Sequence, residues 1–209
     1  MRIRAAVACA FVAALVTAAP SWALDNRIAN GEFDTSVNDW SSIVSGTSFW
    51  LQSEDADACL GSQSMQVDNS GTTDNFVAEM RTCTTAVTAG DSYQVSGSFR
   101  FLEATATSAA TLVVYFYTTS DCVGGFIGSP SAAPTASSTV SGWQDRFVGG
   151  IVAPVGTGSA WVGVNLQKFN GGDPNADVLV DRVRFTDDTY EFASGFEVGD
   201  SCRWSAASP

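Results

Sequence analysis

The chain has 209 residues, of which 22 are acidic and 10 are basic, so its formal net charge is −12, and it contains no histidine. An acidic surface repels nucleic acids and anionic membrane surfaces, so neither is expected as a partner. The absence of histidine removes the commonest general base and excludes Ser-His and Cys-His catalytic pairs.

The first 23 residues have the pattern of a secretory signal peptide. Arg2 and Arg4 precede an apolar run over residues 5–19, and Ser21-Trp22-Ala23 places small residues at the cleavage position. This run is shorter than the roughly 20 apolar residues of a membrane span, so no membrane insertion is expected. We therefore predict an exported mature chain that starts at Leu24 and lies outside the cell or on its surface.

The segments after the signal peptide alternate apolar and polar residues between turn-forming clusters, which predicts an all-β fold. In residues 93–101, Arg100 lies on the polar side of a strand. The segment 112–117 is apolar throughout, and Tyr115 and Tyr117 share one of its sides. A third predicted strand begins at Gly142-Trp143. One of its sides carries Trp143, Phe147 and Ile151.

Residues 161–169 predict a strand with an apolar side and a side suited to sugars. The first side carries Val162, Val164 and Leu166, and the second carries Trp161, Asn165, Gln167 and Phe169. Sugar C–H faces stack on aromatic rings, and sugar hydroxyls bond to amides, which donate and accept. The alternative is a face covered by another layer, with the amides bonded to a neighbouring strand.

The last predicted strand covers residues 178–185, before a tail of different composition. By alternation, one side of this strand carries Leu179, Asp181, Val183 and Phe185. We expect one sandwich domain over residues 24–187 and a tail over residues 188–209.

Four cysteines follow the signal peptide, and an even number in an exported chain favours disulfides. They allow three complete pairings of Cys59, Cys83, Cys122 and Cys202. The turn-rich residues 69–72 predict a hairpin between residues 64–67 and 76–82, which would bring Cys59 opposite Cys83. We favour that pair, and Cys122 with Cys202 follows by elimination.

Three segments in this order resemble one protein family: Asn30-Gly31-Glu32-Phe33-Asp34 followed by Trp40, then residues 88–96, then residues 178–185. They are similar to the jelly-roll carbohydrate-binding modules with a galactose-binding-like fold, especially the cellulose and xylan binders of bacterial glycanases. The resemblance covers residues 25–185 and implies an antiparallel β-sandwich. Residues 192–205 resemble a C-terminal motif of exported bacterial proteins.

In that family, the first segment and an acidic residue of the last strand often meet at a structural calcium ion, away from the sugar site. The matching residues here are Asp34 and Asp181. Calcium prefers carboxylate and carbonyl oxygens. The alternative is that Asp34 caps a turn and Asp181 pairs with an arginine such as Arg27.

A second acidic group is expected to be a solvated loop: Glu54, Asp55 and Asp57.

Two carboxylates alone can hydrolyse a glycoside, but they must face each other across a cleft. Glu79 and Asp145 are the only acids that alternation places on an exposed strand face, and a salt bridge with Arg81 or Arg146 would explain either. The only lysine, Lys168, falls on the core side of its strand. We therefore predict that the protein is not an enzyme.

The predicted function is a secreted module that binds a polysaccharide or oligosaccharide on a concave sheet face. Aromatic residues would stack on sugar rings, and amides and arginine would orient the hydroxyls. The candidate ligand-binding residues are Arg100, Tyr115, Tyr117, Trp161, Asn165 and Gln167, with Trp50 as a loop aromatic at the rim of the site. The alternative is a cell-surface or extracellular structural or adhesion protein that uses the sandwich as a scaffold without a sugar ligand.

Overall fold

A computed structural model describes residues 26–57, 62–102, 107–129 and 135–188. The predicted signal peptide, Cys59, Cys202 and all of the predicted tail except Asp188 lie outside these ranges. Across the four described ranges, no helix has the length and apolar character that crossing a membrane requires.

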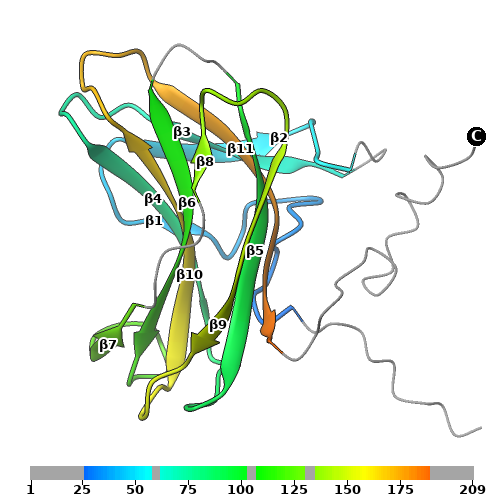
Figure 1. Cartoon of the computed structure of the whole chain (residues 1–209), viewed down its shortest axis with the longest axis vertical. Helices are drawn as coiled ribbons and strands as arrows, with labels where there is room; N and C mark the ends of the chain where they lie inside the picture. Colours follow the sequence, from blue (N-terminus) through cyan, green and yellow to red (C-terminus); the bar gives the residue numbers. More distant parts are fainter. Residues whose placement is uncertain (1–25, 58–61, 103–106, 130–134, 189–209) are drawn as a thin grey trace, which may run out of the picture.

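Two antiparallel sheets pack face to face, which confirms the predicted β-sandwich (Figure 1). The six-stranded sheet has the order β1 (Ser41–Ser42), β4 (Phe76–Thr84), β10 (Ser159–Lys168), β6 (Ser108–Tyr117) and β7 (Phe126–Gly128), and β8 (Ala136–Ser137) also pairs with β6. The five-stranded sheet has the order β2 (Thr47–Gln52), β3 (Ser64–Asn69), β11 (Ala176–Asp187), β5 (Ser92–Phe101) and β9 (Gln144–Val152).

The core lies between the sheets and is filled by alternate residues of the longer strands. In β10, Val162, Val164 and Leu166 are fully buried, as their alternation predicts. Lys168 is also buried on this side, and its Nζ donates to the carbonyl oxygen of Asp173 at 3.2 Å. The side of β10 that carries Trp161 therefore faces away from the core.

A β-bulge in β11 makes one prediction wrong. The register with β5 shifts between Asp181 and Arg184, and Arg182 has a φ of 53°. The extra residue reverses the alternation, so Val183 and Phe185 enter the core while Leu179 and Asp181 remain outside it. These four side chains do not share one side of the strand.

A second irregularity, in β9, changes the predicted side of Phe147. Tyr93 pairs with Ile151 and Val95 with Val148, so two steps along β5 match three along β9. Gly150, with a φ of 69°, accommodates the extra residue. Ile151 is therefore buried, whereas Phe147 is 55% exposed.

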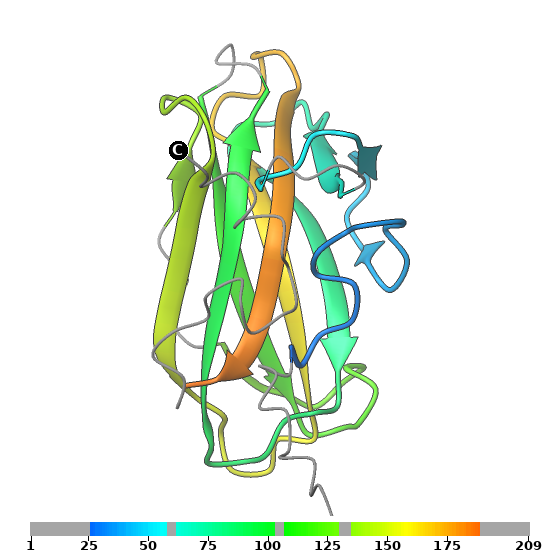
Figure 2. The same ribbon diagram turned by 90° about the vertical axis from the view of Figure 1, so that its right-hand side faces the viewer.

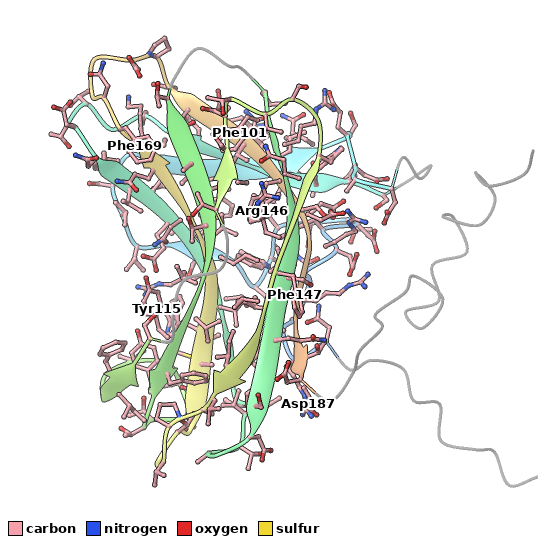
Figure 3. All side chains as sticks on the ribbon, in the orientation of Figure 1. Phe101, Tyr115, Arg146, Phe147, Phe169 and Asp187 are labelled. Atoms are coloured by element: carbon pink, nitrogen blue, oxygen red, sulfur yellow. A yellow bond between two sulfur atoms is a disulfide. The ribbon has the colours of Figure 1, made fainter. Side chains whose placement is uncertain are left out.

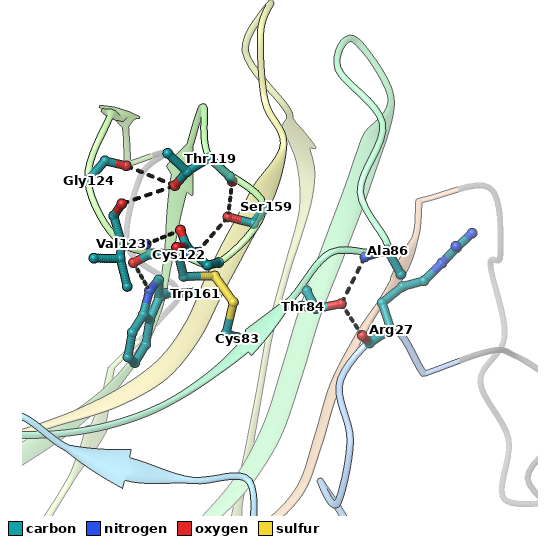
Figure 4. The surroundings of a disulfide bond; sticks show 11 residues. Arg27, Cys83, Thr84, Ala86, Thr119, Cys122, Val123, Gly124, Ser159 and Trp161 are labelled. Atoms are coloured by element: carbon teal, nitrogen blue, oxygen red, sulfur yellow. Dashed lines mark hydrogen bonds between the residues drawn. A yellow bond between two sulfur atoms is a disulfide. The ribbon is translucent and has the colours of Figure 1, made fainter.

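The predicted hairpin is wrong, because β3 and β4 belong to different sheets. The chain crosses the sandwich between Asn69 and Phe76, so Cys83 lies in the six-stranded sheet. There it forms a disulfide with Cys122, with 6.0 Å between the Cα atoms (Figure 4). Both predicted pairs, Cys59 with Cys83 and Cys122 with Cys202, are therefore incorrect.

The first described residues run along β11, past Val180, the last residue of β11 that pairs with β3 (Figure 2). The amide of Arg27 donates to the carbonyl oxygen of Phe185 at 2.8 Å. The amide of Val183 donates to the carbonyl oxygen of Gly31 at 2.9 Å. This pairing places Glu32 near the bulge, where its carboxylate meets Arg184.

Candidate functional site

The outer side of the six-stranded sheet brings most of the predicted ligand-binding residues together. Trp161 pairs with Cys83 on one side and Tyr115 on the other, and Asn165 pairs with Glu79 and Thr111. We call this surface the six-stranded face. Its members used below are Glu79, Arg81, Tyr115, Tyr117, Phe126, Trp161, Asn165 and Gln167.

Trp161 is held in place from two directions. Its indole Nε1 donates to the carbonyl oxygen of Cys122, in the loop fixed by the disulfide (Figure 4). The guanidinium carbon of Arg81 lies 3.8 Å from the centroid of the indole ring, a cation–π contact. The ring is therefore pre-oriented, and at most one of its faces remains for a sugar.

An aromatic group lies beside Trp161, at the β6–β7 edge. Phe126 is 60% exposed, and its ring centroid lies 6.2 Å from that of Tyr115 and 5.9 Å from that of Tyr117, in edge-on geometry. Figure 3 shows Tyr115 on the side of the six-stranded sheet. The sequence did not predict Phe126, because three residues of β7 are too few to show an alternation.

Three buried polar atoms at the centre of the face have no hydrogen-bond partner among the described residues: Arg81 Nε, Glu79 Oε1 and Asn165 Oδ1. Glu79 Oε1 lies 3.3 Å from a terminal nitrogen of Arg81, an ion pair without hydrogen-bond geometry. Buried polar atoms without partners cost free energy, and ligands or water usually satisfy them. Sugar hydroxyls, which donate and accept, match this mixture of acceptors and a donor.

The electrostatics of the face follow from burial. Burial raises the pKa of Glu79 above its ordinary value, and the charge of Arg81 opposes that shift. Burial also raises the pKa of Tyr115, with a smaller contribution from the charge of Glu79, while a hydrogen bond from Asn165 to the Tyr115 hydroxyl acts in the opposite direction. Asn165 thus acts on the Tyr115 hydroxyl, and its carbonyl oxygen is the buried acceptor without a hydrogen-bond partner among the described residues.

The structure places the seven predicted ligand-binding residues on two different sheets. Five lie on the six-stranded face: Tyr115, Tyr117, Trp161, Asn165 and Gln167. Trp50 and Arg100 lie on the outer side of the other sheet, where Trp50 belongs to β2 rather than to a loop and Arg100 pairs with Glu54. Alternation assigns side chains to a side of a strand, but it does not tell which strands share a sheet.

Comparison with known proteins found no matching family model and no matching curated protein. Solved structures do match: TmCBM61 in complex with β-1,4-galactotriose has a TM-score of 0.50 and 15% identity, over 78% of this chain and 98% of that one. The CBM22-2 xylan-binding domain of Paenibacillus barcinonensis Xyn10C has a TM-score of 0.53 and 12% identity, over 75% and 97%. The chain has the fold of a carbohydrate-binding module.

An enzyme also contains this module fold. The arabinose-bound α-L-arabinofuranosidase MgGH51 matches with a TM-score of 0.58 and 12% identity, over 82% of this chain. The chain spans only 28% of the length of that enzyme, whereas it spans nearly all of the two carbohydrate-binding modules. The similarity therefore concerns the module and its fold.

The module fold raised the expectation of a calcium ion at Asp181, which is almost completely buried. Its carboxylate accepts hydrogen bonds from the amides of Ala56 at 2.9 Å and Arg182 at 2.7 Å. Burial raises the pKa of Asp181 to about 8, and the charges of Glu32, Asp55 and Asp57 add to the shift, against the hydrogen bond from Ala56. Arg184 pairs with Glu32 and Arg182 with Asp57, so part of this negative charge is already compensated, and a cation would compensate more of it.

The arrangement of side chains around Asp181 gives less support to a metal ion than the negative charge there does. Asp34 is not among the charges that act on Asp181, and its carboxylate accepts from Ser62 Oγ at 3.1 Å. Within the described part of the chain, no three acidic, histidine or cysteine side chains are arranged to hold one ion. The alternative interpretation paired Asp181 with Arg27. In the structure, Arg27 pairs instead with Asp187, at 2.7 Å.

Glu54, Asp55 and Asp57 are not simply solvated, as the sequence suggested. Asp57 pairs with Arg182 at 3.0 Å and Glu54 pairs with Arg100, so this loop is tied to the five-stranded sheet. The loop therefore forms part of the surroundings of Asp181.

Proposed function

We propose that this protein is a secreted, non-catalytic module that binds a polysaccharide or oligosaccharide on the six-stranded face. The observation that carries the proposal is the set of three buried polar atoms of Arg81, Glu79 and Asn165 beside Trp161 that have no hydrogen-bond partner among the described residues. A neutral sugar supplies the hydroxyls that these atoms lack, and its C–H faces match the neighbouring rings.

The residues have separate roles in this proposal. Trp161, Tyr115 and Phe126 stack on or border sugar rings, while Asn165, Glu79 and Arg81 bind hydroxyls. Each well-placed ring adds about 1 kcal/mol beyond area burial. Contacts with two or three sugar rings then correspond to millimolar to micromolar affinity, about −4 to −8 kcal/mol.

The placement of the acidic residues supports binding without hydrolysis. Glu79 pairs with Arg81 on the six-stranded face, whereas Asp145 pairs with Arg182 on the other sheet at 2.6 Å. Two carboxylates on opposite sheets do not flank one glycosidic bond. The two matches of nearly full length, to TmCBM61 and the CBM22-2 domain, are carbohydrate-binding modules.

Export is supported by the disulfide between Cys83 and Cys122, since such bonds persist in oxidising compartments. We expect a chain expressed with residues 1–23 to appear outside the cytoplasm, with its new N-terminus at Leu24. Edman or mass-spectrometric analysis of the exported chain tests the cleavage position; an intact Met1 on exported protein would contradict it.

The proposed function is tested by affinity electrophoresis in gels cast with xylan, β-glucan, galactan or chitin derivatives. We expect at least one polysaccharide to retard the wild-type protein, and Asn165→Ala to reduce the retardation. Migration unaffected by every polysaccharide would overturn the proposal and favour a scaffold without a sugar ligand.

A calcium ion beside Asp181 is a second, structural proposal. The support is the buried carboxylate, on which the charges of three acidic residues act: Glu32, Asp55 and Asp57. An ion at this position would add to the compensation that Arg182 and Arg184 provide, and it would tie the start of the domain to β11. Its role would be stability, because it lies on the sheet opposite the sugar-binding face.

A further inference from the structure

The outer side of the five-stranded sheet contains a pocket that the proposed function does not use. It has a volume of about 180 Å³ and is formed where β5, β9 and β11 lie side by side. The side chains that matter are Ser96, Ser98, Asp145, Phe147, Arg182 and Arg184. In Figure 2 this sheet faces the viewer, with β11 in orange and β5 in green.

The β11 bulge shapes one wall of the pocket. Arg182 has a left-handed φ of 53°, a conformation that costs free energy in a residue other than glycine. Its guanidinium is held by Ser98 Oγ at 2.9 Å, Asp57 at 3.0 Å and Asp145 at 2.6 Å. Bulges often redirect a side chain at a functional site, and here the bulge fixes Arg182 at the pocket.

Arg184 supplies hydrogen-bond donors to the pocket. Its side chain is only 11% exposed, and its Nε donates to Glu32 Oε1 at 2.8 Å. No hydrogen bond is found for its two terminal nitrogens among the described residues, and neither is a fully buried atom without a partner, so both remain in contact with solvent. The guanidinium therefore presents solvent-accessible donors to the pocket, and these suit a ligand that accepts hydrogen bonds.

The pocket also offers an apolar surface and an acceptor. Phe147 is 55% exposed, although it lies on a strand, and the carboxylate side chain of Asp145 is 76% exposed. Figure 3 labels Phe147 on the side of the five-stranded sheet, away from Tyr115. An exposed ring, a free donor set and an exposed carboxylate together match the C–H face and hydroxyls of a sugar.

The charge balance favours a neutral ligand over an anion. Arg184 already faces Glu32, and Arg182 faces Asp57 and Asp145. A ligand carboxylate would approach these acidic groups in a protein of net charge −12. A neutral polyhydroxyl ligand meets no such repulsion.

We propose that this pocket is a second carbohydrate site, which binds one neutral sugar residue, such as a chain end or a side branch. Its volume is smaller than that of pockets for drug-sized ligands, about 300–1,000 Å³, and so suits a single ring. The proposal does not depend on binding at the six-stranded face. With both sites, the module binds through two opposite faces and links two glycan chains.

The test is a titration of the ¹⁵N-labelled full chain with single sugars, followed by backbone amide shifts in NMR spectra. The ligands are D-galactose, D-glucose and D-xylose, each raised into the millimolar range, with D-galacturonate as the anionic comparison. We expect saturable shifts at Gly97, Phe147 and Arg184 with at least one neutral sugar. Gly163 and Val113 report the six-stranded face in the same spectra, so the two sites are observed separately.

Two variants test the residues of the pocket. Phe147→Ala removes an exposed ring, and Arg184→Lys keeps the charge but loses the planar set of donors. We expect each to weaken binding of that sugar by about five- to tenfold. Trp50→Ala, which removes an exposed ring of β2 on the same sheet, is the matched control and should leave this binding unchanged.

Three results would overturn the proposal. They are an absence of saturable shifts at Gly97 and Phe147 with all three neutral sugars, tighter binding of galacturonate than of galactose, and unchanged affinity in Phe147→Ala. Because Phe147 is exposed, its substitution should leave the melting temperature close to that of the wild-type protein, which confirms that the variant is folded.

Discussion

Asn165 shows how one side chain can be placed for a ligand. Its side chain acts on the Tyr115 hydroxyl in the direction that lowers the pKa of Tyr115, while its carbonyl oxygen is buried without a hydrogen-bond partner among the described residues. Gln167, two positions further along β10, bonds to Asn75 Oδ1 at 3.4 Å near the end of the strand. The two amides of the predicted site therefore differ in their surroundings.

We expect Asn165→Ala to weaken binding of the retarding polysaccharide by about tenfold, because one hydrogen bond to a sugar hydroxyl is lost. Gln167→Ala should cause a smaller loss, since Gln167 lies at the margin of the face. Isothermal titration calorimetry with both variants measures the difference. A larger loss in Gln167→Ala would place the centre of the site elsewhere on β10.

The elements explain why this face is rigid. The disulfide joins the end of β4 to the β6–β7 loop, and the same loop accepts the hydrogen bond from Trp161. Removing the bond therefore affects both the stability of the sandwich and the orientation of the ring. Figure 4 shows these contacts together.

We predict that Cys83→Ser with Cys122→Ser lowers the free energy of unfolding by about 3–4 kcal/mol, given a sequence separation of 39 residues between the bonded cysteines. Sugar affinity should also fall, because the loop no longer fixes Trp161. Urea unfolding and calorimetry measure the two effects. Lower stability with unchanged affinity would show that the loop does not orient the ring.

Strand alternation was sufficient to predict the sides of β10 and the all-β class, because successive side chains of a regular strand always alternate. It failed in β9 and β11, where an extra residue near Gly150 or at Arg182 reverses the alternation. It also could not predict that β3 and β4 lie in different sheets, on which the pairing of Cys83 depends. Strand order is set by long-range packing, which a local pattern does not contain.

The whole molecule carries a net charge of −12, and its acidic residues are not evenly placed. Burial raises the pKa of Asp181 to about 8, and the charges of three acidic residues add to this shift: Glu32, Asp55 and Asp57. The six-stranded face, in contrast, contains the paired Glu79 and Arg81. Acidic residues thus gather beside Asp181 on the five-stranded sheet, where Arg182 pairs with Asp57 and Arg184 with Glu32.

In the presence of a chelator, the free energy of unfolding should fall as the pH rises from about 4 to about 8. Over this range the unfolded chain releases the proton of Asp181 while the folded chain retains it, so deprotonation favours unfolding. The slope from this group is at most about 1.4 kcal/mol per pH unit. Denaturant unfolding across this range measures it, and Asp181→Asn should have a flatter profile; identical profiles would contradict the assignment.

Calcium should raise the melting temperature at pH about 8, because an ion that binds only the folded state stabilises it. The increase should be lost in Asp181→Asn and after chelation, whereas Asp145→Asn, on the same sheet, is the control that keeps it. A melting temperature unaffected by calcium in the wild-type protein would refute the proposed ion.

The central claim is that the six-stranded face binds glycans, and two tryptophan variants test it most directly. On the polysaccharide that most retards the wild-type protein, Trp161→Ala should lose the retardation, because it removes the fixed ring of the face. Trp50→Ala, which removes an exposed ring from the other sheet, should migrate as the wild-type protein does. Retardation that persists in Trp161→Ala, or is lost in Trp50→Ala, would contradict the claim.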